Sequence, residues 1–235
     1  MWLTHAKAIA IKELIEGFRT SWRFAVPVVG MGTFMSWFVV RSYVLAVGSD
    51  PVMLKVAASM SIIYMGLLVI PFMSNGYLVR SLIEERQKQS ILALLATGVA
   101  PHVMWLAKLV AAFVLSYLVM LVSLGIHLVV TWLYWHVTPV FTAQSVVGAL
   151  VVSPLLALAL SALMGFLFWY FPYPQIVGMI VPLLVAMVSW NYAWKTPGAG
   201  ILQDVTLVSI IAPVVIIAAA AVLISRTSRQ KVAGL

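Results

Sequence analysis

Long apolar runs, separated by short polar stretches, make up most of this sequence of 235 residues. The longest run extends from Leu109 to Trp194, where 86 consecutive positions contain no Asp, Glu, Lys or Arg. A helix needs about 20 apolar residues to cross a bilayer, so this run alone accommodates three crossings. Because the runs are continuously apolar and do not alternate with polar positions, they predict helices and not a β-barrel.

Turn residues, aromatic clusters and charges divide the apolar runs into six predicted membrane helices. These helices cover residues 24–47, 56–79, 104–132, 145–168, 176–190 and 205–224. The pattern therefore predicts an all-α integral membrane protein with a single transmembrane domain over residues 1–235. Six crossings would place both ends of the chain on the same side of the bilayer.

Residues 5–22, before the first crossing, have the spacing of an amphipathic helix. Its apolar positions are Ile11, Leu14, Ile15, Phe18 and Trp22, and its polar positions, which fall largely on the other side, are Lys12, Glu13, Glu16 and Arg19. We expect this helix to lie in the membrane interface, with a soluble N-terminal helix as the alternative. Because charges interrupt the first 23 residues, no cleavable signal peptide is expected.

Composition supports the membrane assignment, since 64% of the residues are hydrophobic and only 9% are charged. The net charge of +8 reflects topology and not nucleic-acid binding, because basic residues collect on one predicted side. That side carries Lys7, Lys12, Arg19, Arg23, Arg80, Arg86, Lys88, Lys108, Arg226, Arg229 and Lys231, whereas the other carries Arg41, Lys55 and Lys195. Both termini are therefore expected in the cytoplasm, with the protein in the plasma membrane. The absence of cysteine excludes disulfides and thiolate chemistry.

The main polar interruption, residues 80–101, lies between the second and third predicted crossings. Its charged residues are Arg80, Glu84, Glu85, Arg86 and Lys88, and its apolar residues Ile91, Leu94 and Leu95 share one helical face. Gly98 and Pro101 fit the end of one helix and the first turn of the next. We expect a short cytoplasmic helix whose apolar face fits a groove on a soluble partner, with a simple solvated loop as the alternative.

This pattern resembles the permease subunits of the type-two ABC transporter superfamily. The residues that carry the resemblance are Lys12, Glu13 and Arg19 in the first helix, then Glu85, Arg86, Ser90, Leu94, Leu95, Thr97 and Lys108. Gln89 and Ala93 depart from the Gly and Glu that are usual in the family. The architecture matches over essentially the whole chain, but the sequence signal is concentrated in about thirty residues around the polar interruption.

The resemblance implies an ATP-driven exporter in which residues 80–101 form a coupling helix against a separate ATPase. The residues expected to couple to that ATPase are Glu84, Glu85, Arg86, Lys88, Ile91, Leu94, Leu95 and Thr97. Two ATPase subunits, carrying ATP and Mg²⁺, and a second permease, identical or similar, are the implied partners. No phosphate-binding loop of the form GxxxxGK[ST] occurs in this sequence, so no cofactor or catalytic residue is expected on this chain.

Scarce charge in the crossings indicates an apolar or amphipathic cargo. Two alternatives remain open: a haem-export-type permease of cytochrome c maturation, and a membrane enzyme or assembly factor that does not transport. His127 is the one imidazole well inside a predicted crossing, where it is interpreted as a packing residue and less favourably as a substrate ligand. Asp204 is expected to pair with Lys195. No His pair has metal-ligand spacing, so no metal is expected.

Overall fold

The computed structural model describes residues 2–47, 51–87, 96, 98–136, 146–170 and 200–226, and the elements within these ranges are all helices. They are α1 (Trp2–Val47), α2 (Pro51–Gln87), α4 (Pro101–Trp135), α6 (Ser153–Tyr170) and α8 (Gly200–Ser225). A single turn of π-helix, η1 (Gly148–Val152), leads directly into α6. The prediction of an all-α protein is confirmed for the described residues.

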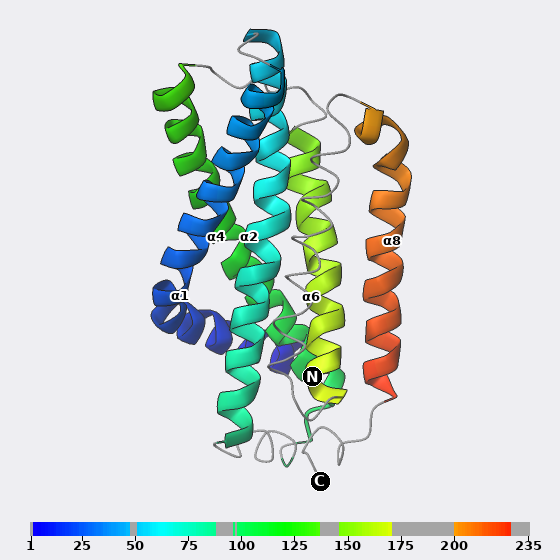
Figure 1. Ribbon diagram of the computed structural model, residues 1–235. Coiled ribbons are helices and arrows are strands. Elements are labelled where there is room, and N and C mark those ends of the chain that lie inside the picture. The colour runs from blue at the N-terminus through cyan, green and yellow to red at the C-terminus, as the bar shows by residue number, and fades with distance from the viewer. Residues whose placement is uncertain are drawn as a thin grey trace.

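The long helices form a bundle in which α2 packs against α1, α4 and α6, and α6 packs against α8 (Figure 1). The chain enters α1 and α4 at the same end of this bundle at which it leaves α2, α6 and α8 (Figure 1). We call this the N-terminal end. The last turn of α2 and the first turn of α4 therefore lie at the same end of the bundle as the first part of α1 (Figure 1).

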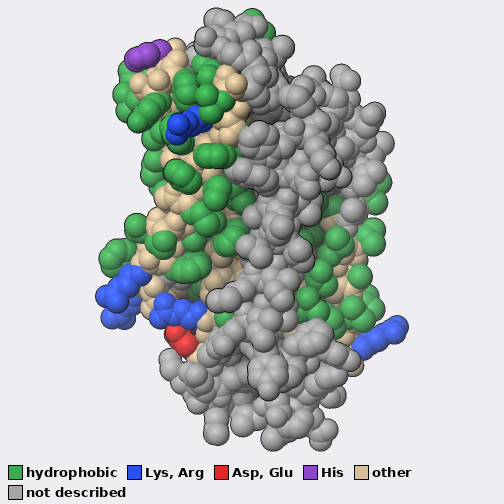
Figure 2. Space-filling view, in the orientation of Figure 1, with side chains coloured by type: hydrophobic (Ala, Val, Ile, Leu, Met, Phe, Trp, Pro, Cys, Tyr) green, Lys and Arg blue, Asp and Glu red, His purple; other side chains and the backbone are tan. Residues whose placement is uncertain are grey.

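Three helical segments in the described residues are long and apolar enough to cross a membrane, and they indicate a membrane protein. They are Trp22–Ser42, Pro101–Trp135 and Gly148–Leu167, with mean hydropathies of 1.4, 2.5 and 2.3, and a shorter apolar helix covers Pro213–Ser225. Figure 2 shows hydrophobic side chains over most of the described surface between the Lys and Arg side chains near the two ends. The predicted crossing at 176–190 lies outside the described residues, and the total of six crossings remains a prediction.

The predicted interfacial helix at 5–22 and the predicted crossing at 24–47 belong to one helix, because α1 is continuous from Trp2 to Val47. Its first part nevertheless lies across the N-terminal end before the helix turns to run along the bundle (dark blue in Figure 1). Two local features weaken the helical backbone hydrogen bonds between these two parts of α1. Pro27 cannot donate to the carbonyl of Arg23, and the Thr20 hydroxyl donates to the Glu16 carbonyl at 2.7 Å.

The structure also shortens the predicted coupling loop, because α2 continues as a helix to Gln87. Arg80, Glu84 and Glu85 therefore belong to the last turns of α2 and not to a loop. Pro101 begins α4 as predicted, after an extended Ala100, where the missing proline N–H would have had no helical partner in any case. Gly98 has φ of +83°, a conformation that residues with a side chain rarely adopt.

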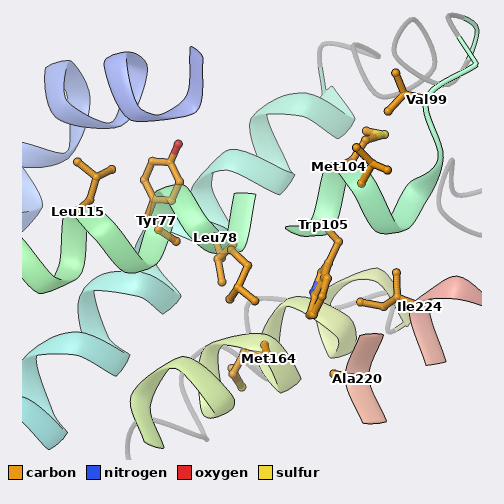
Figure 3. Close-up of a cluster of buried hydrophobic side chains, with 13 residues drawn as sticks. Tyr77, Leu78, Val99, Met104, Trp105, Leu115, Met164, Ala220 and Ile224 are labelled. Carbon is orange, nitrogen blue, oxygen red and sulfur yellow. The ribbon is translucent and has the colours of Figure 1, made fainter. Parts of the chain in front are cut away.

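The core consists of two groups of buried apolar side chains. One lies near the N-terminal end, where Tyr77, Leu78, Trp105, Met164 and Ile224 join α2, α4, α6 and α8 (Figure 3). The other lies further along the bundle and contains Val28, Met65, Val69, Ile70, Met73, Met120 and Ala157. Since lipid is as apolar as these side chains, close packing contributes more to their association than exclusion from water does.

Candidate functional site

Charged side chains from three helices meet at the N-terminal end, beside the first core group. Glu13 comes from α1, Glu85 from the last turn of α2, and Lys108 from the second turn of α4. Tyr77 and Ser81 of α2 complete the arrangement. We call these five residues the buried ion cluster, since Glu13, Glu85 and Lys108 are only 3%, 8% and 1% exposed.

Lys108 lies at the centre of this cluster, and its ammonium contacts three oxygen acceptors. The Nζ atom is 2.7 Å from Glu13 Oε1, 2.9 Å from Glu85 Oε1 and 2.6 Å from Ser81 Oγ. An ammonium group has three N–H donors, so each finds an acceptor. The charge of Lys108 is therefore fully solvated by protein groups although the side chain is excluded from solvent.

Glu13 is held by further hydrogen bonds from α2. The Tyr77 hydroxyl lies 2.6 Å from Glu13 Oε2 and 2.7 Å from the Glu13 main-chain carbonyl, and Ser81 Oγ donates to Glu13 Oε2 at 3.0 Å. In Figure 3 the Tyr77 hydroxyl points from the core group towards a neighbouring helix. One side chain thus belongs both to the apolar core and to the ion cluster.

Helical spacing explains how the sequence assembles these groups. Tyr77, Ser81 and Glu85 recur every four residues, so they project from one face of α2. Glu13 has Gly17 four residues later on the same face of α1. A Cβ atom added at Gly17 would overlap the side chains of Tyr77 and Leu115, so the glycine allows α1 to approach α2 and α4 closely.

The two carboxylates differ in acidity although both contact Lys108. Burial raises the pKa of Glu13, but the charge of Lys108 and the hydrogen bonds from Lys108, Tyr77 and Ser81 outweigh burial, and the pKa lies below its usual value. Burial also raises the pKa of Glu85, and with the added repulsion of Glu13 it outweighs the attraction of Lys108. Of the two carboxylates beside Lys108, Glu85 is therefore the one that gains a proton more readily.

Further charged side chains of α1 and α2 lie beside the buried ion cluster, where it borders a pocket. Arg80 Nε donates to Glu84 Oε1 at 2.7 Å, and Arg80 Nη1 donates to the Thr20 carbonyl of α1 at 3.3 Å. Lys12 and Glu16 form a longer exposed pair at 3.9 Å. These side chains line a polar pocket of about 190 Å³ that opens beside Glu13 and Glu85. The pocket lies where the chain leaves α2 for the predicted coupling segment.

Among the residues predicted for the interfacial helix, Lys12, Glu16 and Arg19 are exposed. Glu13, which the sequence pattern grouped with them, faces the bundle, and its carboxylate is buried against Lys108. The pattern within residues 5–22 could not reveal that partner, which lies 95 positions further along the chain. A lysine within an apolar run was the available signal, since such a charge requires a buried counter-ion.

Of the predicted coupling residues, Glu84 is half-buried beside Arg80, and Glu85 is held inside the ion cluster. The Glu85 carboxylate is thus directed towards Lys108 and not towards a surface partner. The backbone of Arg86 belongs to α2. The remaining predicted positions, Lys88, Ile91, Leu94, Leu95 and Thr97, lie outside the described residues, as does the Arg86 side chain.

His127 lies further along α4 and is 1% exposed. Its Nε2 atom is 2.7 Å from Ser61 Oγ of α2 and 3.4 Å from Thr131 Oγ1 of the next turn. These contacts join α2 and α4. Within the part of the chain that the structure describes, no three His, Asp or Glu side chains are grouped to hold a metal ion. The predicted pair of Asp204 and Lys195 lies outside that part, since Lys195 and the Asp204 side chain are not described.

Comparison with known proteins found no match among protein-family models, curated proteins or solved structures. The family resemblance therefore rests on the residues of this chain alone.

Proposed function

We propose that this protein is the membrane-spanning permease subunit of an ATP-driven ABC exporter of the type-two superfamily. Two cytoplasmic subunits would bind and hydrolyse ATP with Mg²⁺, and a second permease, identical or similar, would complete the translocation path. Both termini, and with them the N-terminal end of the bundle, would face the cytoplasm. The distribution of Lys and Arg along the sequence supports this orientation.

The buried ion cluster is the observation that carries the proposal. A permease that hydrolyses no ATP needs a rigid connection between the segment that contacts the ATPase and the helices that move. Glu85 is two residues before the end of α2, and Lys108 is in the second turn of α4. Their ion pair therefore joins the two helices on either side of residues 88–100. Glu13 adds α1 to the same connection.

The cluster supplies a path for mechanical work. A force applied to residues 88–100 would act on the last turn of α2 and the first turns of α4 together. Because the Glu13 and Lys108 side chains are 2.7 Å apart and shielded from solvent, α1 would move with them. The continuity of α1 through its turn would then convert movement of the first part into a tilt of the part that runs along the bundle.

The cargo class follows from the scarcity of charge along the apolar helices. Within the three membrane-span candidates, the described charged side chains are Arg23, Arg41 and Lys108, and Lys108 is already engaged by Glu13 and Glu85. An apolar or amphipathic molecule needs no buried counter-ion on its route. We therefore propose such a molecule, exported at the expense of ATP, as the substrate.

Co-purification tests the proposal. The tagged full chain is extracted from its native membrane in mild detergent, and the proteins that remain bound are identified by mass spectrometry and assayed for ATP hydrolysis. We expect an ATPase with a phosphate-binding loop at an equimolar ratio to the permease. If the chain is recovered without any such protein under conditions that preserve its fold, the exporter proposal is wrong.

A further inference from the structure

An apolar groove lies between α1 and α4, beside the part of α1 that follows Gly17. It has a volume of about 510 Å³. Its lining residues are Gly17, Phe18, Trp22, Ala25, Val26 and Val29 of α1, Met73 of α2, and Leu115, Leu118, Val119, Val122 and Ile126 of α4. None of these side chains carries a charge, so the groove is suited to a hydrocarbon chain.

The length of the groove fits one acyl chain. Along α4 it extends from Leu115 to Ile126, which at 1.5 Å per residue is about 16 Å. The hydrocarbon core of a bilayer is about 30 Å thick, so each leaflet contributes about 15 Å. The groove begins near the N-terminal end, where α1 carries its charges. It therefore spans about one leaflet, measured from the bilayer surface inwards.

The mouth of the groove is cationic. The Arg23 guanidinium lies 5.8 Å from the ring centre of Trp22, which lines the groove, and Arg19 is exposed one turn earlier on α1. Among the residues that the structure describes, no carboxylate forms an ion pair with Arg19 or Arg23. In Figure 2, Lys and Arg side chains gather at the lower left, over the turn of α1. An indole ring beside a guanidinium is typical of the level of lipid headgroups.

We propose that this groove binds one anionic phospholipid, with an acyl chain between α1 and α4 and its phosphate at Arg19 and Arg23. The charge at the mouth selects an anionic headgroup over a zwitterionic one, because only the former has net charge opposite to the two guanidinium groups. The bound lipid would pack against α1 and α4 along the groove. This inference does not depend on the transport proposal.

The test measures lipid retention by the purified full chain. Protein in detergent receives either phosphatidylglycerol or phosphatidylcholine with the same acyl chains, and native mass spectrometry counts the lipids that remain bound. We expect preferential retention of phosphatidylglycerol. The double variant R19Q/R23Q should lower that preference about tenfold, whereas R226Q, which removes an exposed charge at the end of α8, should leave it unchanged.

A second pair of variants tests the groove itself. Val122 lines the groove and is 59% exposed, whereas Val129 lies two turns further along α4, outside the groove, and is 56% exposed. V122W should displace the acyl chain and reduce retention of both lipids, while V129W should retain them like the wild type. Both are surface substitutions, and unchanged elution on size exclusion verifies folding.

Equal lipid retention by V122W and V129W would overturn the proposal, and so would an unchanged phosphatidylglycerol preference in R19Q/R23Q. A change of oligomeric mass in V122W without any change in lipid retention would also overturn it, because the groove would then be a contact between two copies of the chain.

Discussion

Lys108 is the residue on which the buried ion cluster depends, since it is the cation that both carboxylates contact. Two carboxylates around one ammonium are not equivalent, and the hydrogen bonds make Glu13 the stronger partner. Removing one member of a buried ion pair is costly because the remaining charge loses its compensation, whereas neutralising a surplus carboxylate relieves repulsion. Substitutions at Glu13 and Glu85 should therefore differ although both change Glu to Gln.

We predict that E13Q destabilises the protein by about 3 kcal/mol at neutral pH, and that E85Q changes its stability by less than about 1 kcal/mol. Thermal denaturation in detergent, followed by size exclusion of the surviving protein, measures the difference. K12Q serves as the control, because Lys12 is exposed and its pair with Glu16 is long. Equal loss of stability in E13Q and E85Q would mean that the two carboxylates share the lysine equally.

The same cluster predicts opposite pH dependences. Because the folded-state pKa of Glu13 is lowered, its contribution is complete above the usual Glu value of about 4.3 and is lost as pH falls through the folded value. The folded-state pKa of Glu85 is raised instead. Its contribution to stability is therefore present below about pH 4.3 and is lost as the pH rises through the folded-state pKa. The stability deficit of E13Q should thus shrink on acidification, and E85Q should gain relative to wild type as pH rises. Denaturation midpoints measured from pH 4 to 8 check the sign for E85Q, and the same series extended below pH 4 checks the sign for E13Q. Parallel curves for all three proteins over the whole range would contradict the assignment.

At the scale of the elements, α1 is the helix that connects the bundle end to its long apolar part. Its contact with α2 and α4 requires a residue without Cβ at Gly17, whereas a Cβ at Gly30 would meet no atom within 4 Å. The sequence pattern predicted the amphipathic character of the first part and the apolar character of the second. It could not predict that the two parts form one helix. The same pattern of residues fits both a continuous helix and two helices with a break near residue 23.

We predict that G17A destabilises the protein by about 1–3 kcal/mol, because the added methyl group overlaps Tyr77 and Leu115. G30A is the matched control on the same helix. It should stabilise α1 by roughly 0.5–1 kcal/mol, since alanine is a better helix former than glycine and the site has room. Thermal denaturation of the two variants measures whether each substitution raises or lowers the stability. A G17A protein as stable as G30A would show that α1 does not pack tightly at this point.

For the whole molecule, periodicity and apolar length predicted the helices that the structure describes, with boundaries displaced by several residues at the ends of α2 and α4. The buried ion cluster was not predictable in the same way, because Glu13, Glu85 and Lys108 are far apart in sequence and each fits a local pattern by itself. The rule that a charge in an apolar run needs a partner identifies Lys108, but only the packing of α1, α2 and α4 determines which carboxylates reach it.

Topology is the first prediction for the whole molecule. The sequence contains no cysteine, so single cysteines can report exposure on each side of the membrane without a background. S90C and S228C should be protected from a membrane-impermeant maleimide added outside intact cells, and S49C should react. Labelling of S90C from outside would place the predicted coupling segment on the wrong side and would remove its access to a cytoplasmic ATPase.

The rate of ATP hydrolysis by the complex reconstituted in lipid vesicles tests the central claim most directly. The claim is that the apolar face predicted within residues 80–101 transmits work between the ATPase and the bundle. L94D places a charge on that face, whereas A96D places the same charge at an exposed position outside it. We predict that L94D lowers the rate about tenfold or more while A96D keeps it, since the few residues at the centre of an interface each cost about 2 kcal/mol or more when replaced. An L94D complex that assembles and hydrolyses ATP at the wild-type rate would contradict the account.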